Sequence, residues 1–552
     1  MMKLNVGRGT VLCLVLLVLA LSGWILADLS LRLNFLSDDS FYVTLPAKSF
    51  VQNGIPSIDG VNPTNGFHPL IFTLDVLLAK LGVEDIYLVN QLLGVGFLLL
   101  AAWLFFRYLE RFLDRGLSLL LACGLLVNPF MFVSSLSGLE SLIFAAALIV
   151  FYGSMYANVD NLCAGDHVPL SAWWKSGLLG MLAYLCRTEF LFHLLGMGVA
   201  FSLLWVLGWQ KGRRGDCVRS IIPGLFLAGP TVIAFCLFGF FGKVMTGHFT
   251  QSSASQKSVI HELVAGDWGA MDPGRFLSGF LSHGLLPVLL LLLPFVLFAG
   301  RWRSLRPGLF FMICATTCTL LFYILLIRIY QWHYMASYVT MLSLSLPLFL
   351  RDAKCDTRNA IRTFGIALVV AGGIGWMFYF DRENFYQFRN QDLVFAILYL
   401  AVWALSFKVV MPLRRHGQAV LIAGVVACCT TVWKGESLRA IHVRRHVLCE
   451  ELNVLLDREV TVGVAAVGIY AKFLKTPVIN MDGAISWPAL EALWQGQLAE
   501  FVQEQGVDVI LEYPEFPGFV RINEGWPDGR LNTILVRETR TDLIQQLEPL
   551  TN

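Results

Sequence analysis

Long apolar segments alternate with short polar ones along most of this chain, and that alternation predicts a helical membrane protein. The first apolar run covers 11–27, and the run at 86–106 is long enough to cross the hydrocarbon core, which takes roughly 20 helical residues. Between them, Pro69 to Leu81 is apolar for only about a dozen residues, so we expect a juxtamembrane helix that does not cross.

Further apolar runs of near-spanning length follow, and with the first two they predict about thirteen transmembrane helices. They cover 117–134, 140–156, 173–186, 190–208, 219–241, 279–299, 308–327, 334–350, 361–379, 393–411 and 417–433.

The basic residues assign a side to each connecting loop. Clusters of Lys and Arg at 107–115, 211–214, 301–303, 351–362 and 414–415 all fall on one side, which the positive-inside rule makes cytoplasmic. The N-terminus is then inside and the C-terminus outside. Asp160 and Asp166 depart from the pattern, because they stand in a cytoplasmic loop where basic residues are expected.

After Lys434 the chain becomes charged and mixed, so we divide it into a transmembrane domain at 1–433 and a tail at 434–552. The transmembrane domain includes a first extracytoplasmic loop at 28–85. In the tail, Val460 to Ala466 and Val507 to Leu511 predict strands, and Pro488 to Gln505 predicts a helix between them. We therefore expect a small extracytoplasmic α/β domain.

Composition supports a polytopic membrane protein. The 552 residues are 56% hydrophobic and 14% charged, whereas soluble domains have about 25% charged residues. A net charge of +2 without a basic patch excludes nucleic acid as a partner. The 12 cysteines include no Cys-x-x-Cys pair and are expected to be small core residues. Because the first apolar run lacks a small-residue cleavage site, we interpret it as a retained span.

An acidic pair, Asp38 and Asp39, follows the first span within the polar stretch from Leu36 to Leu70, where we place the active site. Carboxylates are costly in hydrocarbon, so these two should lie at the membrane surface, within reach of a lipid headgroup. One carboxylate could take a proton from an attacking acceptor. Alternatively, the pair only caps the helix expected from Asp39 to Phe50, which ends at Asn53-Gly54.

Other polar residues fall on the same face. Asn65 and His68 lie in the same stretch, and Glu140 opens a span, where a helix N-terminus alone would also favour a carboxylate. Arg187 and Glu189 join two spans with almost no loop, so these charges should pair or face a polar cavity. Arg187 is a candidate for binding a phosphate, and Glu189 for orienting it.

Two later segments could bind a phosphate or another anion. Lys257 ends a Ser-rich polar segment suited to anion contacts, although a flexible loop would look the same. Arg328, His333 and Tyr334 combine a cation with aromatic faces, which suits a phosphate or a sugar ring but is also typical of an aromatic membrane belt. No set of His, Cys and carboxylate residues has metal-ligand spacing, so no metal site is predicted.

These stretches together resemble the GT-C superfamily of integral-membrane glycosyltransferases. The resemblance covers nearly the whole chain and is closest to the bacterial polyprenyl-phosphate-sugar enzymes, which are related to lipid A aminoarabinose transferases and mycobacterial arabinofuranosyltransferases. It rests on Asp38-Asp39, Asn62-Pro63-Thr64-Asn65-Gly66-Phe67-His68-Pro69, Ser137-Gly138-Leu139-Glu140, Arg187-Thr188-Glu189 and Val478-Ile479-Asn480-Met481-Asp482-Gly483.

The resemblance implies an inverting glycosyltransferase of the bacterial cytoplasmic membrane. The donor would be a polyprenyl-phosphate sugar, and the acceptor a lipid, glycan or protein outside the cytoplasm. Asp38 matches the general base, and Asp39 would shape its surroundings. No cofactor is identified, and a divalent cation stays an open alternative. Thr188 stands where relatives commonly have Pro, and Trp332-His333-Tyr334 replaces an Arg-Tyr-Tyr, which leaves the residues that bind the donor phosphate open.

The competing interpretation is a transporter or flippase of a lipid-linked or anionic solute, which would also place charges near spans. A transporter of the inverted-repeat type would show related halves and charges near the middle of the membrane. This chain shows no internal repeat, and its unusual charges lie at one interface. The sequence therefore favours the enzyme.

Overall fold

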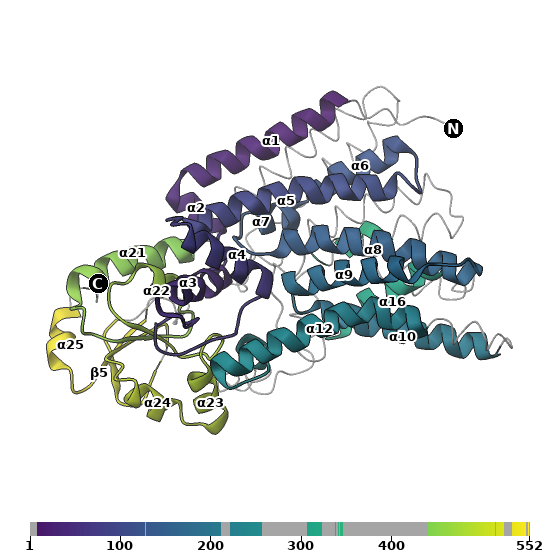
Figure 1. The fold of residues 1–552 in the computed structure, drawn as a ribbon. Helices are drawn as coiled ribbons and strands as arrows, with labels where there is room; N and C mark the ends of the chain where they lie inside the picture. The colour runs from purple at the N-terminus through teal and green to yellow at the C-terminus, as the bar shows by residue number, and fades with distance from the viewer. Residues whose placement is uncertain are drawn as a thin grey trace, which may run out of the picture. The chain divides into compact units, whose positions relative to one another are not determined.

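A computed structural model of the chain describes residues 8–126, 128–210, 221–256, 306–322, 440–513, 515–523 and 533–547, together with 337, 340–341, 343–345 and 550 (Figure 1). The chain divides into two compact units, each of which is described by itself. The helical unit comprises Met1–Asp28, Asn90–Phe235 and Pro273–Gly435. The mixed unit comprises Leu29–Val89, Cys236–Asp272 and Glu436–Asn552.

Apolar helices make up the described part of the helical unit. They are α1 (Arg8–Ala27), α5 (Ile86–Leu109), α6 (Arg115–Leu126), α7 (Pro129–Ser135), α8 (Ser141–Ala164), α9 (Leu170–Cys186), α10 (Phe190–Gln210), α12 (Ile221–Thr246) and α16 (Pro307–Phe322). The first residues of α5 and the last residues of α12 belong to the mixed unit. Within the unit, α8 packs against α9 and α16, and α10 packs against α16.

Several of these helices have the length and composition of membrane spans. In the described part of the chain, α5, α8 and α12 qualify, with 24, 24 and 26 residues, and α1 together with α2 (Leu29–Phe35) would be a fourth span with a break. The chain is thus a multi-pass helical membrane protein. The predicted spans 279–299, 361–379, 393–411 and 417–433 lie outside the described residues, so the total of about thirteen stays a prediction.

The single helix predicted over 117–134 is wrong, because α6 ends at Leu126 and α7 begins at Pro129. Proline has no N–H to donate and disfavours the helical conformation of the residue before it, so an apolar run can continue while the helix does not. Asn128 caps the new helix, since its Oδ1 accepts from the Met131 N–H at 3.3 Å.

Two helices predicted in the first loop are confirmed, and they belong to the mixed unit. α3 covers Asp38–Asn53 and ends where Gly54 adopts φ 76°, with its N–H donating to the Phe50 carbonyl. α4 covers Pro69–Lys80 and begins with its proline, as is usual for helices. The two helices pack together, and the Thr44 hydroxyl donates to the fully buried Asp75 carboxylate at 2.6 Å.

The tail contributes a five-stranded sheet of order β2-β1-β3-β5-β4. Strand β1 is parallel to β2 and β3, whereas β5 is antiparallel to β3 and β4. The strands are β1 (Val462–Val464), β2 (Val478–Asn480), β3 (Val509–Leu511), β4 (Phe519–Arg521) and β5 (Ile534–Arg537), and the helices are α21 (Ala440–Leu455), α22 (Gly468–Phe473), α23 (Trp487–Gln495), α24 (Leu498–Glu504) and α25 (Thr541–Leu547). Both predicted strands are present, as β1 and β3.

The single helix predicted from Pro488 to Gln505 is wrong, because it is the two helices α23 and α24. Gly496 separates them in the left-handed conformation, at φ 69°, and this conformation ends a helix at low cost only for glycine.

One hydrophobic core joins the first loop to the tail within the mixed unit. Leu33, Phe41 and Tyr87 from the loop pack with strand residues such as Val462 and Val509. Because these side chains bury one another, the loop and the tail fold together rather than separately. This shared core brings the acidic pair to the tail.

Candidate active site

The acidic pair opens α3. Asp38 and Asp39 occupy the first turn of the helix, where carboxylates are favoured by the helix dipole. The Asp38 side chain is 20% exposed, and its Oδ2 accepts from Nη1 of Arg445 at 3.2 Å. Arg445 belongs to α21, so the residue predicted as general base forms an ion pair with the tail.

Arg445 is held by a second carboxylate. Its Nε donates to Oε1 of Glu512 at 2.7 Å, and its Nη2 donates to Oε2 at 2.6 Å, which is the bidentate geometry that gives strong pairing. The Tyr470 hydroxyl also donates to Glu512 Oε1, at 2.7 Å. The side chains of Arg445 and Glu512 are each only 8% exposed. One arginine therefore lies between two carboxylates in a largely dry site.

The surroundings of Asp38 bring the pKa of its carboxyl group close to neutral pH. Burial raises the pKa of the Asp38 carboxyl to about 7, the charge of Arg445 partly opposes this shift, and the charges of Glu512 and Asp39 add to it. A general base works best when its pKa lies near the working pH. Asp38 therefore has the proton affinity that the predicted role requires.

A glycine lets α22 approach the acidic pair. A Cβ atom on Gly468 would lie 2.8 Å from Asp38 Oδ1 and 2.9 Å from the Asp38 carbonyl oxygen. Backbone cannot move away as a flexible side chain would, so any other residue at 468 would displace the start of α3.

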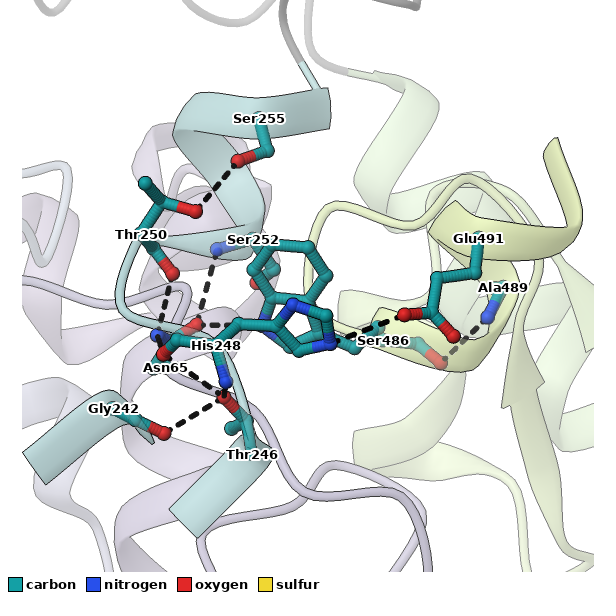
Figure 2. A network of polar contacts seen from close by, with 11 residues as sticks. Asn65, Gly242, Thr246, His248, Thr250, Ser252, Ser255, Ser486, Ala489 and Glu491 are labelled. Carbon is teal, nitrogen blue, oxygen red and sulfur yellow. Dashed lines mark hydrogen bonds and ion pairs between the residues drawn. The ribbon is translucent and has the colours of Figure 1, made fainter. Parts of the chain in front are cut away.

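The Asn62 to Pro69 motif meets the tail at Asn65. Its Oδ1 accepts from the Ser252 N–H at 3.1 Å and from the Trp487 indole N–H at 2.9 Å, and its Nδ2 donates to the Thr250 carbonyl at 2.7 Å (Figure 2). Asn65 is 1% exposed. This predicted cavity residue thus joins three segments that are far apart in sequence.

A histidine that the sequence did not single out lies in the same network. The His248 ring stacks on Trp487, with centroids 3.7 Å apart, and its Nε2 lies 3.1 Å from Oε1 of Glu491 (Figure 2). His248 lies in the polar segment before Lys257, so the polar composition of that segment was the available signal.

The Val478 to Gly483 motif forms a hydrogen-bonded turn after β2. Asn480 donates to Asp482 Oδ1 at 2.9 Å and accepts from the Gly483 N–H at 3.0 Å, and Asp482 Oδ1 also accepts from the Ala484 N–H. Burial raises the pKa of Asp482 to about 6, these hydrogen bonds partly oppose the rise, and the charge of Asp39 adds to it. The turn and the acidic pair are therefore electrostatic neighbours.

The helical unit contains a separate charged cluster. Arg187 Nη1 lies 3.0 Å from Glu140 Oε1, and Arg187 Nη2 lies 3.1 Å from Glu189 Oε2. All three side chains are buried. The predicted pairing of Arg187 with Glu189 is confirmed, and Glu140 joins it from the start of α8. The cation is here balanced by two carboxylates.

The remaining predicted residues are less informative. His68 is half-buried and immediately precedes α4. Lys257, Arg328, His333 and Tyr334 lie outside the described residues. Within the ranges that the structure describes, no group of His, Cys, Asp and Glu side chains is arranged to hold a metal ion.

Sequence comparison finds no relative, whereas structure comparison does. No protein-family model matches the chain, and no curated protein matches it. The structure of ArnT from Cupriavidus metallidurans bound to undecaprenyl phosphate matches with a TM-score of 0.55 at 15% identity, covering 96% of this chain and 98% of that one. The apo ArnT structure matches at 0.51 and 13% identity, covering 97% and 99%. The archaeal oligosaccharyltransferase AglB from Archaeoglobus fulgidus scores 0.43 at 12% identity, covering 90% and 69%.

The two ArnT matches cover nearly all of both chains, so this protein has the ArnT fold. The polytopic helical membrane fold predicted from the sequence is therefore confirmed. Sequence reasoning missed Arg445, Glu512 and Tyr470, which surround the proposed base. They lie in the tail, where no local pattern marks them.

Proposed function

We propose that this protein is an inverting glycosyltransferase that moves a sugar from a polyprenyl-phosphate donor to an acceptor on the extracytoplasmic face of the membrane. The observation that carries the proposal is Asp38, a largely buried carboxylate at a helix start, with a pKa of about 7. The GT-C fold supports it, because the matching position in that superfamily is the general base.

The chemistry asks little more of the protein than one well-placed base. An acceptor hydroxyl or amine attacks the anomeric carbon of the donor while Asp38 takes its proton. The bond from that carbon to the phosphate oxygen breaks, and the polyprenyl phosphate leaves with the electron pair. One displacement inverts the anomeric configuration, and the proton on Asp38 then passes to water.

A polyprenyl phosphate suits this fold as the lipid partner. The ArnT structure that matches this chain holds undecaprenyl phosphate. We keep Arg187 and Glu189 as the proposed phosphate residues, with Lys257, Arg328 and His333. Because Arg187 already contacts two carboxylates, a phosphate bound there would add further negative charge around one buried cation, which is costly.

Transfer of radiolabelled sugar from a mixed pool of polyprenyl-phosphate sugars, measured in membranes, tests the proposal. We expect Asp38→Asn to lower transfer by at least about 10²-fold, because an amide cannot accept the proton. Asp59→Asn is the matched control, since the hydrogen bonds that Asp59 accepts in the described part of the chain come from its own loop.

Both variants must insert in the membrane at the level of the wild type for the comparison to count. Equal transfer by wild type and Asp38→Asn would remove Asp38 as the base. No transfer by the wild type, with any donor and a crude acceptor extract, would contradict the enzyme and favour a lipid-linked-solute transporter.

A further inference from the structure

We infer that Arg445 in the tail is a positioning residue for the reaction, which holds the Asp38 carboxylate in place and sets its charge state. The inference rests on the proposed function, because it gives Arg445 a role only if Asp38 is the base. It assigns to the tail a direct part in an active site whose other predicted residues precede it in the chain.

The direction of the Arg445 side chain is set by the tail itself. Glu512 binds Nε and Nη2 together, at 2.7 and 2.6 Å, and this leaves Nη1 for Asp38. A guanidinium group is planar and rigid, so a bidentate bond on one edge fixes where the remaining N–H groups point. Tyr470 holds Glu512 in turn through its hydroxyl. Asp38 therefore meets a cation that is already oriented.

Glu512 is built into this arrangement at a cost. It has φ 63°, the left-handed region that side chains other than glycine seldom adopt. Such a conformation persists only where the surroundings hold it, and here three hydrogen bonds to the Glu512 carboxylate do so. The pairing of Glu512 with Arg445 thus helps to hold Glu512 in a backbone conformation that is otherwise unfavourable for a residue other than glycine.

The charged and titratable groups around Asp38 come from five parts of the mixed unit. They are Asp39 and Tyr42 on α3, Arg445 on α21, Tyr470 on α22, and Glu512 and Asp482 in the segments after β3 and β2. Arg445 favours the charged form of Asp38, whereas Glu512 and Asp39 oppose it.

Neutralising Arg445 and neutralising Glu512 should therefore shift the pKa of Asp38 in opposite directions. Arg445→Gln removes the cation and leaves the Glu512 charge, so the pKa of Asp38 rises. Glu512→Gln removes a like charge and keeps the cation, so the pKa falls. A variant that merely loosened the site would expose Asp38 to water and lower its pKa whichever partner was changed, so only an electrostatic role predicts the rise for Arg445→Gln. The opposite signs separate an electrostatic role from a structural one.

The experiment is the pH profile of sugar transfer, in which the rate rises as the base loses its proton. We expect Arg445→Gln to move the midpoint upward by about 1 pH unit or more, so that transfer falls roughly tenfold on the acid side and less at high pH. We expect Glu512→Gln to move it downward, and Arg445→Lys to stay nearer the wild type. Arg444→Gln, one position away on α21, is the matched control and should leave the midpoint unchanged.

A thermal double-mutant cycle with Asp38→Asn and Arg445→Gln keeps this inference separate from the proposed function. If the wild type transfers sugar but both midpoints stay fixed or move the same way, the inference is wrong. If no sugar is transferred, the proposed function fails, and the cycle still tests the contact. Melting losses that add without coupling would then overturn the inference, whereas a double variant no worse than the poorer single variant would support the contact.

Discussion

At the scale of single residues, Asp38 and Arg445 form an ion pair between the first loop and the tail. Asp38 follows a long apolar run, and that position alone placed its charge at an interface. The ion pair of Arg187 and Glu189 could be predicted because the two charges are close in sequence and join two spans. Arg445 is 407 positions from Asp38 and lies in an ordinary polar helix, so nothing near it in the sequence indicates the contact.

Asn65 gives a prediction at this scale. Asn65→Ala leaves the Trp487 indole and the Ser252 N–H, both in buried residues, and the carbonyl of the exposed Thr250 without their partner, and each unsatisfied buried group costs about 1–3 kcal/mol. We expect the free energy of unfolding to fall by at least about 2 kcal/mol. Thermal unfolding in detergent and limited proteolysis of the tail would measure the loss.

Asn53→Ala is the control for this change, because Asn53 is an exposed asparagine at the end of α3. Trp487→Phe should reproduce part of the loss, since it removes the indole donor and leaves the other two bonds to Asn65. If Asn65→Ala had the same melting temperature as Asn53→Ala, the network in Figure 2 would contribute nothing to stability.

At the scale of elements, the ends of helices could be predicted where a glycine or a proline marks them. Gly54 ended α3 and Pro69 opened α4, as expected. The breaks at Pro129 and Gly496 were missed because the apolar or helix-forming pattern continues across them. Strands β2, β4 and β5, of three or four residues each, were not predicted, although the predicted strands β1 and β3 are also only three residues long.

Helix packing in the helical unit supplies a matched pair of glycines. On α10, a Cβ atom at Gly196 would lie 2.6 Å from both the Ala315 Cα and the Cys314 carbonyl oxygen of α16, whereas one at Gly198 meets nothing within 4 Å. Small residues let membrane helices pack this closely. We expect Gly196→Ala to cost about 1–3 kcal/mol.

Gly198→Ala, only two positions away on the same helix, should be neutral or slightly stabilising, because alanine favours a helix by up to about 1 kcal/mol over glycine. Melting temperatures of the two purified variants in one detergent provide the comparison. Equal melting of both variants would mean that α10 and α16 do not pack as closely as described.

At the scale of the whole chain, the motifs indicated a fold that no sequence comparison detects. The ArnT structure is only 15% identical to this chain over 96% of it, so the fold is shared while most residues differ. The grouping of the first loop with the tail could not be predicted. Its cause is the shared core, and long-range packing of apolar side chains leaves no periodic signal in a sequence.

The hydrogen bonds of Asn65 restrict the topology of the chain. Asn65, Thr250 and Trp487 lie in three segments of the mixed unit, and Asn65 hydrogen-bonds to both of the others, so all three segments must be on one side of the membrane. The stretches 90–235 and 273–435 must therefore each cross an even number of times. The predicted spans satisfy this condition, and the basic loops predict that the mixed unit is extracytoplasmic.

Reporter fusions in a bacterial host test this topology. We expect alkaline phosphatase joined after Asn552 to be active, because its disulfides form only outside the cytoplasm, and green fluorescent protein at the N-terminus to fluoresce. Phosphatase joined after Arg415 should be inactive, since that loop is basic and cytoplasmic. Activity after Arg415 with none after Asn552 would put Asp38 in the cytoplasm, where an extracytoplasmic acceptor could not reach it.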